Sequence, residues 1–189
     1  MKPPTDTDLV RRARNGDTLA FGDLVRRHRR FVINLAYRFL ASRDDAEDAA
    51  QEVFVKMWRK LDGYREDSKI TTWLYTMVTN QCLDVLKSPA RKRGRETLSA
   101  DERLLVSDPG SHEQARDQEE RLQLVALLAS QLPEKQQAVF VLRDLQGAET
   151  QEAAEALDMS AEAIKSNLYH ARLKMRELIL AYEKEKIKS

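Results

Sequence analysis

Apolar residues recur at intervals of three or four along most of the chain, which is the spacing of amphipathic helices. The longest run follows Asp17, a candidate N-cap, and places Phe21, Leu24 and Phe39 on one face until about Ala41. The opposite face of this run carries a cluster of arginines. We find no stretch that alternates apolar and polar residues as a half-buried strand does. The pattern therefore predicts an all-α protein.

Further helices are predicted wherever the same spacing returns. Gly63, Pro89 and Gly147 mark helix ends, and Thr150 and Ser160 are candidate caps of the last two helices. The predicted helices cover about residues 6–14, 17–41, 44–61, 71–87, 113–132, 133–147, 151–157 and 161–182.

The periodicity is lost over residues 88–117, which contain Pro, Gly and many charged side chains. This composition is typical of a flexible interdomain linker. We therefore expect two small helical domains, residues 1–95 and 112–189, joined by a flexible linker over residues 96–111.

The charge distribution supports separate modules. The 189 residues carry a formal net charge of only +1, but residues 1–95 have a net charge of +7 and residues 96–132 one of −5. The single cysteine, Cys82, excludes an internal disulfide, and the three histidines show no metal-ligand spacing. No apolar run approaches the ~20 residues of a membrane span, and the N-terminus has no apolar signal core. We expect a soluble, cytoplasmic protein without metal or cofactor.

The most specific local pattern is a helix-turn-helix over residues 150–172. A short helix ends at Leu157, a turn follows, and the second helix opens with a polar cap. Its N-terminal residues can face base edges in a major groove, and Arg172 and Lys174 can reach phosphates. A plain helical hairpin with solvated charges is the alternative.

A polar stripe on the helix over residues 71–87 is the second candidate. Asn80, Asp84 and Lys87 follow one another by steps of four and three and lead into a basic cluster. Such a surface can hold a nucleic-acid backbone and contact exposed bases. A solvated helix face is the alternative, and we expect Trp73 to be a core residue.

The third candidate is the helix that begins at Asp44, whose polar face is flanked by Phe54 and Trp58. This face is a possible protein-docking surface. An ordinary amphipathic helix is the alternative.

Together these stretches resemble the extracytoplasmic-function (ECF) sigma factors of the sigma-70 family. The resemblance extends over about residues 17–90 and 119–180. It is carried by residues 45–54 (Asp-Ala-Glu-Asp-Ala-Ala-Gln-Glu-Val-Phe), Thr72-Trp73-Leu74, Asn80, Asp84, Leu132-Pro133, Ile164-Lys165-Ser166 and Ala171-Arg172.

The resemblance implies that the first domain is sigma region 2 and the second sigma region 4. It implies a promoter-specificity subunit of RNA polymerase, which is not itself an enzyme and which is a monomer when free. The partners would be the β′ coiled coil and the β subunit of core polymerase, promoter DNA and an anti-sigma factor. The linker would thread towards the polymerase active-site channel.

The resemblance also assigns site residues. Contacts to core polymerase would come from Asp45, Asp48, Gln51, Glu52, Phe54, Lys56 and Trp58. The loop over residues 62–69 and the following helix would recognise and open the −10 element, through Lys69, Asn80, Asp84, Lys87, Arg91, Lys92 and Arg93. The −35 element would be read by Ser160, Lys165, Ser166, Tyr169, His170 and Arg172.

The chain departs from the family pattern at three positions. Asp158 stands in the turn where Gly is commoner, and Asp tolerates the left-handed backbone that the turn needs. Asn167 and His170 stand where the family often has Arg, which leaves fewer fixed charges for phosphate contacts.

Two other functions compete with the sigma interpretation. A free-standing helix-turn-helix regulator would bind duplex DNA without polymerase, usually as a dimer. A small helical hydrolase or nuclease would need Asp44, Asp45, Glu47 and Asp48 as metal ligands, although acidic residues are common in a first helical turn.

Overall fold

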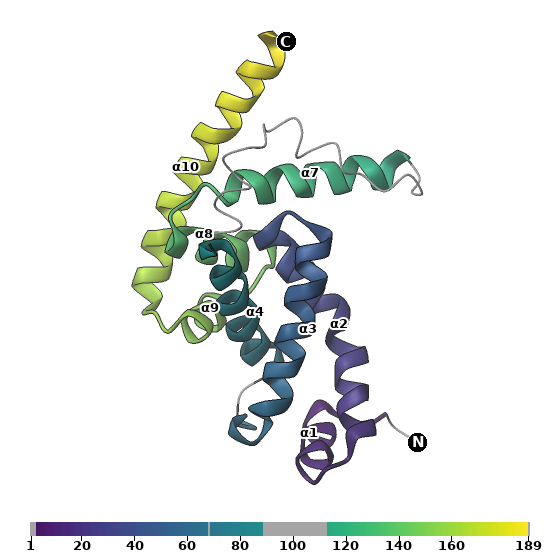
Figure 1. Cartoon of the computed structure of the whole chain (residues 1–189). Coiled ribbons are helices and arrows are strands. Elements are labelled where there is room, and N and C mark those ends of the chain that lie inside the picture. The colour runs from purple at the N-terminus through teal and green to yellow at the C-terminus, as the bar shows by residue number, and fades with distance from the viewer. Residues whose placement is uncertain (1–2, 68, 89–112, 189) are drawn as a thin grey trace.

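The fold is described by a computed structural model, which places residues 3–67, 69–88 and 113–188. These residues form helices joined by short turns, and they include no strand. Figure 1 shows α2 (Thr18–Leu40), α3 (Arg43–Arg59) and α4 (Ile70–Lys87) side by side as a bundle, with α1 (Asp6–Arg14) across one end and α7 (Glu113–Ala129) across the other. The prediction of an all-α protein is confirmed.

Three of the N-terminal helices begin where a polar side chain caps them, and the predicted N-cap at Asp17 is confirmed. Thr5, Asp17 and Ser42 each accept a hydrogen bond from a backbone N–H in the first turn of the helix that follows. The helices are α1 (Asp6–Arg14), α2 (Thr18–Leu40), α3 (Arg43–Arg59) and α4 (Ile70–Lys87), with a 3₁₀ turn, η1 (Leu61–Gly63), after α3.

The core of this bundle is built from the apolar faces that the periodicity predicts. Leu24, Phe39, Met57 and Leu74 are fully buried where α2, α3 and α4 meet. Cys82 is also buried, and the loss of solvation raises the pKa of its thiol. The only cysteine of the chain is therefore an apolar packing residue with little thiolate character.

The C-terminal helices are α7 (Glu113–Ala129), α8 (Glu134–Phe140), α9 (Thr150–Leu157) and α10 (Ala161–Lys188). The prediction of one continuous helix over residues 133–147 needs a correction, because α8 continues as a π-helical segment, η2 (Val141–Leu145). Gly147 ends this segment with a φ of +75°, a backbone conformation that favours glycine. Other boundaries also differ from prediction. Glu149, not Thr150, is the N-cap of α9, and α10 runs past residue 182 to Lys188. The α3 helix ends at Arg59 instead of residue 61, and α7 ends at Ala129 instead of residue 132.

The N-terminal and C-terminal helices pack against each other. Their buried residues form one cluster, with α7 against α2 and α9 against α4. The Gln137 side chain is buried in this contact and donates from Nε2 to the Phe39 carbonyl at 3.3 Å. The Arg38 guanidinium donates to the Leu145 carbonyl and to Oε1 of Gln146.

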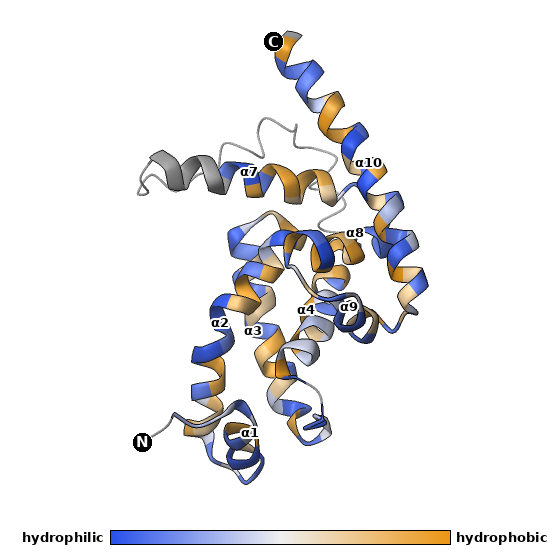
Figure 2. Cartoon of the chain, turned by 180° about the vertical axis from the view of Figure 1, so that it is seen from behind, coloured by the Kyte–Doolittle hydropathy of each residue, from blue (hydrophilic) through white to orange (hydrophobic). Residues whose placement is uncertain are grey.

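The linker predicted over residues 96–111 lies outside the described residues, as do Arg91, Lys92 and Arg93. No described helix combines the length and the hydropathy that a membrane span needs. Figure 2 shows that apolar residues also line part of α10, which projects beyond the rest of the molecule towards the C-terminus.

Candidate nucleic-acid interface

The helix-turn-helix is formed by α9 and the first turns of α10. Asp158 adopts the left-handed conformation, with φ +50° and ψ +52°, and its N–H donates to the Ala154 carbonyl. The Ser160 hydroxyl accepts a hydrogen bond from the N–H of Ala163 at 3.1 Å. The turn and the cap together set the angle at which α10 leaves α9. The predicted left-handed backbone at Asp158 is confirmed.

The first turns of α10 have one buried face and one exposed face. Ile164, Leu168 and Ala171 are buried against the other C-terminal helices. The opposite side carries exposed polar and aromatic side chains, and the Tyr169 ring is 61% exposed with an edge-on contact to His170. Every residue of the predicted −35 set is exposed: Ser160, Lys165, Ser166, Tyr169, His170 and Arg172.

Two side chains near this face already have partners within the protein. Arg172 forms a two-pronged ion pair with Asp144, with N–O distances of 2.7 and 2.8 Å, and this contact raises the pKa of Arg172. Asn167 is half-buried and donates from Nδ2 to the Ala163 carbonyl at 2.8 Å. Arg172 therefore ties α10 to the π-helical segment, and Asn167 is directed at its own helix and not at the exposed face.

The polar stripe on α4 is present as the spacing predicts. Asn80, Asp84 and Lys87 are exposed along the helix, and Lys69 is the N-cap residue of α4. Trp73 is partly buried, with its ring 5.2 Å from that of Tyr64, so its predicted place in the core is confirmed.

Lys69 and Lys87, at the two ends of α4, each form an ion pair with a C-terminal helix. Nζ of Lys69 lies 2.9 Å from Oε1 of Glu152 on α9, and Nζ of Lys87 lies 2.8 Å from Oε1 of Glu134 on α8. The hydrogen bonds raise the pKa of each lysine, and the Lys69 contact lowers the pKa of Glu152. Carboxylates of the C-terminal half are therefore the partners of both lysines, whose side chains remain 75% and 57% exposed.

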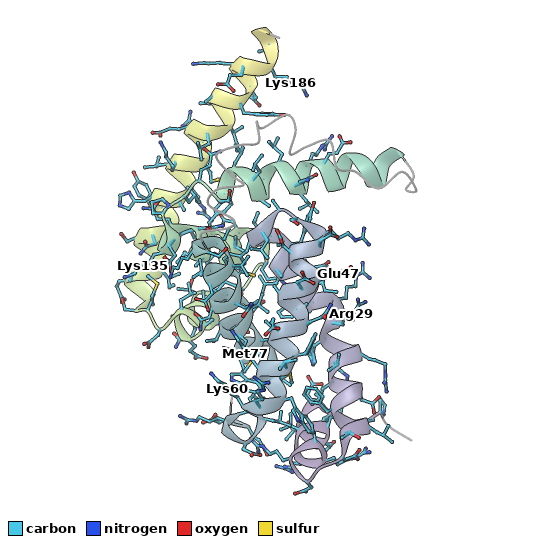
Figure 3. The ribbon with its side chains drawn as sticks, viewed as in Figure 1. Arg29, Glu47, Lys60, Met77, Lys135 and Lys186 are labelled. Atoms are coloured by element: carbon cyan, nitrogen blue, oxygen red, sulfur yellow. The ribbon has the colours of Figure 1, made fainter. Side chains whose placement is uncertain are left out.

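The face of α3 divides into exposed and buried positions. Asp48, Gln51 and Glu52 are exposed, and the Trp58 ring is 41% exposed while it packs edge-on against Phe21. Figure 3 shows neighbouring Glu47 pointing away from the bundle.

The other three residues of the predicted α3 set are less accessible. Phe54 is only 8% exposed and belongs to the core, and Asp45 is half-buried. Lys56 is half-buried and donates from Nζ to Oε1 of Gln81 on α4. The accessible part of the surface is therefore the exposed polar trio with Trp58.

An apolar groove lies between α8 and α10. Its volume is about 410 Å³, and Phe140, Met175, Ile179 and Leu180 contribute most of its apolar lining. Leu180 is 46% exposed there. The sequence does not predict this groove, because α10 has only a weak apolar stripe beyond Met175 and the contact with α8 is tertiary.

The sequence also does not predict the contacts that two arginines on α1 make. Arg11 and Arg14 reach across to the segment between α3 and α4 and bind Glu66. Their spacing on the last turn of α1 is visible in the sequence, but no local pattern identifies a partner more than 50 residues away. Among the described residues, no group of three or more His, Cys, Asp or Glu side chains is arranged to hold a metal ion.

Comparison with known families gives two matches that together cover most of the chain. Residues 24–93 match Sigma-70 region 2, and residues 122–175 match Sigma-70, region 4. The first match contains α3 and α4 with their polar surfaces, and the second contains the helix-turn-helix.

Comparison with curated proteins extends the similarity over nearly the full length. The ECF RNA polymerase sigma-E factor of Haemophilus influenzae is 31% identical over 175 residues, which cover 89% of this chain and 92% of the relative. The sigma-E factor of Escherichia coli K12 is 32% identical over 174 residues, with 89% and 91% covered.

Two solved structures have a similar fold. CnrH, solved in complex with the cytosolic domain of CnrY, superposes with a TM-score of 0.66 at 26% identity, over 93% of this chain and 97% of CnrH. The sigma factor RpoE of Bartonella quintana, solved with the anti-sigma factor NepR, gives a TM-score of 0.59 at 24% identity, over 84% and 96% of the two chains.

Proposed function

Because this chain belongs to the ECF sigma factors of the sigma-70 family, we propose that it binds core RNA polymerase and directs it to promoters with specific −35 and −10 elements. Sigma factors are not enzymes, so the catalytic chemistry belongs to the polymerase. Family membership favours this function over a free-standing helix-turn-helix regulator and over a hydrolase. The protein then acts in the cytoplasm, where core polymerase and promoter DNA are found.

The observation that carries the proposal is the pair of exposed polar surfaces on separate helices. The exposed side of α10 offers Lys165, Ser166 and Tyr169 for duplex readout of the −35 element. The stripe on α4 offers Asn80 and Asp84 for contacts to the opened −10 strand. Residues 1–95 are then region 2, residues 96–111 the linker and residues 112–189 region 4.

Core polymerase is proposed to bind two surfaces. The exposed polar residues of α3 beside Trp58 fit a docking site for the β′ coiled coil, since a partly exposed Trp flanked by polar side chains is typical of a binding hot spot. The apolar groove between α8 and α10 fits an apolar segment of the β subunit.

The packing of the two halves implies a change of shape on the promoter. The two elements are centred about 25 base pairs apart, which is roughly 85 Å of B-form DNA. In the structure, Lys69 of the −10 surface and Glu152 of the helix-turn-helix are joined by a 2.9 Å ion pair. We therefore assign this arrangement to a closed form of the free monomer, in which Glu152 and Glu134 are paired with Lys69 and Lys87, and we infer that it opens on core polymerase.

The closed form also suggests how an anti-sigma factor acts on this protein. The related proteins CnrH and RpoE were solved in complexes, RpoE with an anti-sigma factor. A partner that stabilises the contact between α4 and α9 would hold Lys69 in its ion pair with Glu152 and keep the −10 surface beside the helix-turn-helix.

Footprinting and run-off transcription with purified protein test the function. We expect promoter protection and specific transcripts only when core polymerase is present, on a library with varied −35 and −10 elements. Protection of a duplex site by the protein alone, unchanged by core polymerase, would support the free-standing regulator instead.

A further inference from the structure

The segment between α3 and α4 lacks a regular backbone hydrogen-bond ladder beyond its first turn. After η1, residues Tyr64 to Asp67 have no helical structure, although Tyr64 is buried against Trp73. We call residues 61–67 the α3–α4 loop. The Leu61 carbonyl accepts one backbone hydrogen bond, from the N–H of Tyr64 at 3.2 Å, and holding the loop in one conformation needs additional partners from elsewhere in the protein.

Arg14 supplies those partners from α1. Its Nε donates to the Leu61 carbonyl at 3.1 Å, and Nη2 donates to the carbonyls of Asp62, at 3.4 Å, and Tyr64. Nη1 binds Oε1 of Glu66 at 3.1 Å. The Arg14 side chain is only 23% exposed. A planar guanidinium with five donors can hold four acceptors at fixed angles, whereas a lysine ammonium cannot.

Arg11, one turn earlier, holds the far end of the same loop. Its Nε and Nη2 donate to Oε2 of Glu66 at 3.0 and 2.6 Å, and these hydrogen bonds keep the pKa of Glu66 below its ordinary value. Both arginines therefore meet on one carboxylate.

The helix that carries these arginines is itself fixed. Leu9 and Val10 of α1 are fully buried in the packing with α2. Asp6 at the start of α1 binds Arg27 and His28 of α2, with Nε2 of the buried His28 3.1 Å from the Asp6 carboxylate. The arginines thus project from an anchored helix onto the loop.

We propose that Arg14, supported by Arg11, is a positioning residue for −10 recognition: it sets the conformation in which the α3–α4 loop meets the opened strand, although it contacts no DNA itself. The proposal rests on the assignment of this loop to −10 recognition. It extends the −10 site to α1, which lies outside the matched sigma region and carries none of the predicted site residues.

Arg14→Lys is the direct test, because it keeps the charge and removes the fork of donors. The variant is assembled with core polymerase, and open-complex formation is measured on a set of promoters with single-base changes in the −10 element. A misplaced loop loses base contacts, so the preference for the best −10 sequence over its single-base variants should fall about tenfold. Affinity for core polymerase and the ranking of −35 variants should stay as in the wild type.

Arg12→Lys is the matched control. Arg12 lies on the same helix but binds Asp17 instead of the loop, so its variant should keep the full −10 preference. If Arg14→Lys folds poorly, the charge swap replaces it: Arg11→Glu and Glu66→Arg should each lower the −10 preference, and the double variant should restore it.

The outcomes distinguish the positioning role of Arg14 from the proposed function on which it rests. An unchanged −10 preference in the Arg14→Lys protein would overturn the positioning role. An equal loss of open-complex formation on every −10 variant, accompanied by a lower melting temperature of the protein, would overturn it too. Failure of the double variant to recover would overturn it as well. If the wild-type protein with core polymerase shows no −10 dependence at all, the proposed function itself fails.

Discussion

Replacing Arg38 by Met should shift the protein from its closed form towards an open one. Arg38 lies near the end of α2, and its guanidinium donates to the Leu145 carbonyl and the Gln146 side chain across the contact between the two halves. The guanidinium is half-buried, and burial lowers its pKa. Met keeps most of the apolar stem but removes both hydrogen bonds.

The size of the effect follows from these two bonds. Hydrogen bonds that involve a charged group contribute about 1.5–3 kcal/mol each, but two bonds from one group are not additive, and in the open form water replaces both. We therefore expect a net loss of about 2 kcal/mol for the closed form, which lowers the ratio of closed to open molecules roughly 30-fold.

Single-molecule energy transfer between dyes on Lys60→Cys and Glu155→Cys measures this ratio. Both positions are exposed, one after α3 and one on α9, while the native Cys82 is buried and its raised pKa protects it from labelling. Arg38→Met should increase the population with altered transfer efficiency. Arg29→Met is the control, because Arg29 projects into solvent from the outer side of the same helix (Figure 3).

Identical transfer histograms for the Arg38→Met and Arg29→Met proteins would refute the reasoning. They would mean that the apolar contact between the halves, not the Arg38 bonds, decides the equilibrium. The same dyes on the wild-type protein should report opening when core polymerase is added.

Three further predictions concern the charged surfaces. The contact with Lys69 lowers the pKa of Glu152, so the pair stabilises the closed form at pH values above the ordinary pKa of Glu. This stabilisation is lost as the pH falls through the lowered pKa. A pH series with the dye pair should therefore show acid-induced opening, and Glu152→Gln should abolish it. Asp48→Lys combined with Gln51→Ala should weaken binding to core polymerase at least about tenfold with unchanged helicity, since hot-spot losses exceed about 1–2 kcal/mol, and unchanged affinity in a titration would remove α3 from the interface. Lys165→Ala should cost about 1–3 kcal/mol on promoters with one particular −35 base and little on the others, and an equal loss on every −35 variant would make Lys165 a phosphate contact instead.

Local sequence determines most of the secondary structure, because its causes lie within a few residues. Asp17 and Ser42 cap their helices through first-turn N–H groups, and Gly147 takes the positive φ that ends the π-helical segment. Asp158 accepts the left-handed turn of the helix-turn-helix. The exposed side of α10 follows from the same local pattern. Ile164 and Leu168, four residues apart, are buried on one face of the helix, which leaves the opposite face to solvent.

The tertiary structure corrects two other predictions made from the sequence. The spacing places Phe54 on the apolar face of α3, whereas the family resemblance assigns it to the polymerase contact; packing buries its ring and leaves Trp58 accessible. The π-helical segment within residues 133–147 is likewise invisible to periodicity, because one extra residue in a turn hardly changes the apolar spacing.

The sequence by itself therefore determines the helices, their apolar faces and the polar surfaces that face solvent or partners. Only the tertiary structure decides which charges on those surfaces are already paired. Lys69 meets Glu152 across 83 residues, and Arg14 meets the Leu61 carbonyl across 47. Such pairs depend on how whole helices pack, and neither helical periodicity nor capping carries information over that separation. The contacts between the two halves, and those of Arg14 with the α3–α4 loop, are accordingly properties of the packed chain.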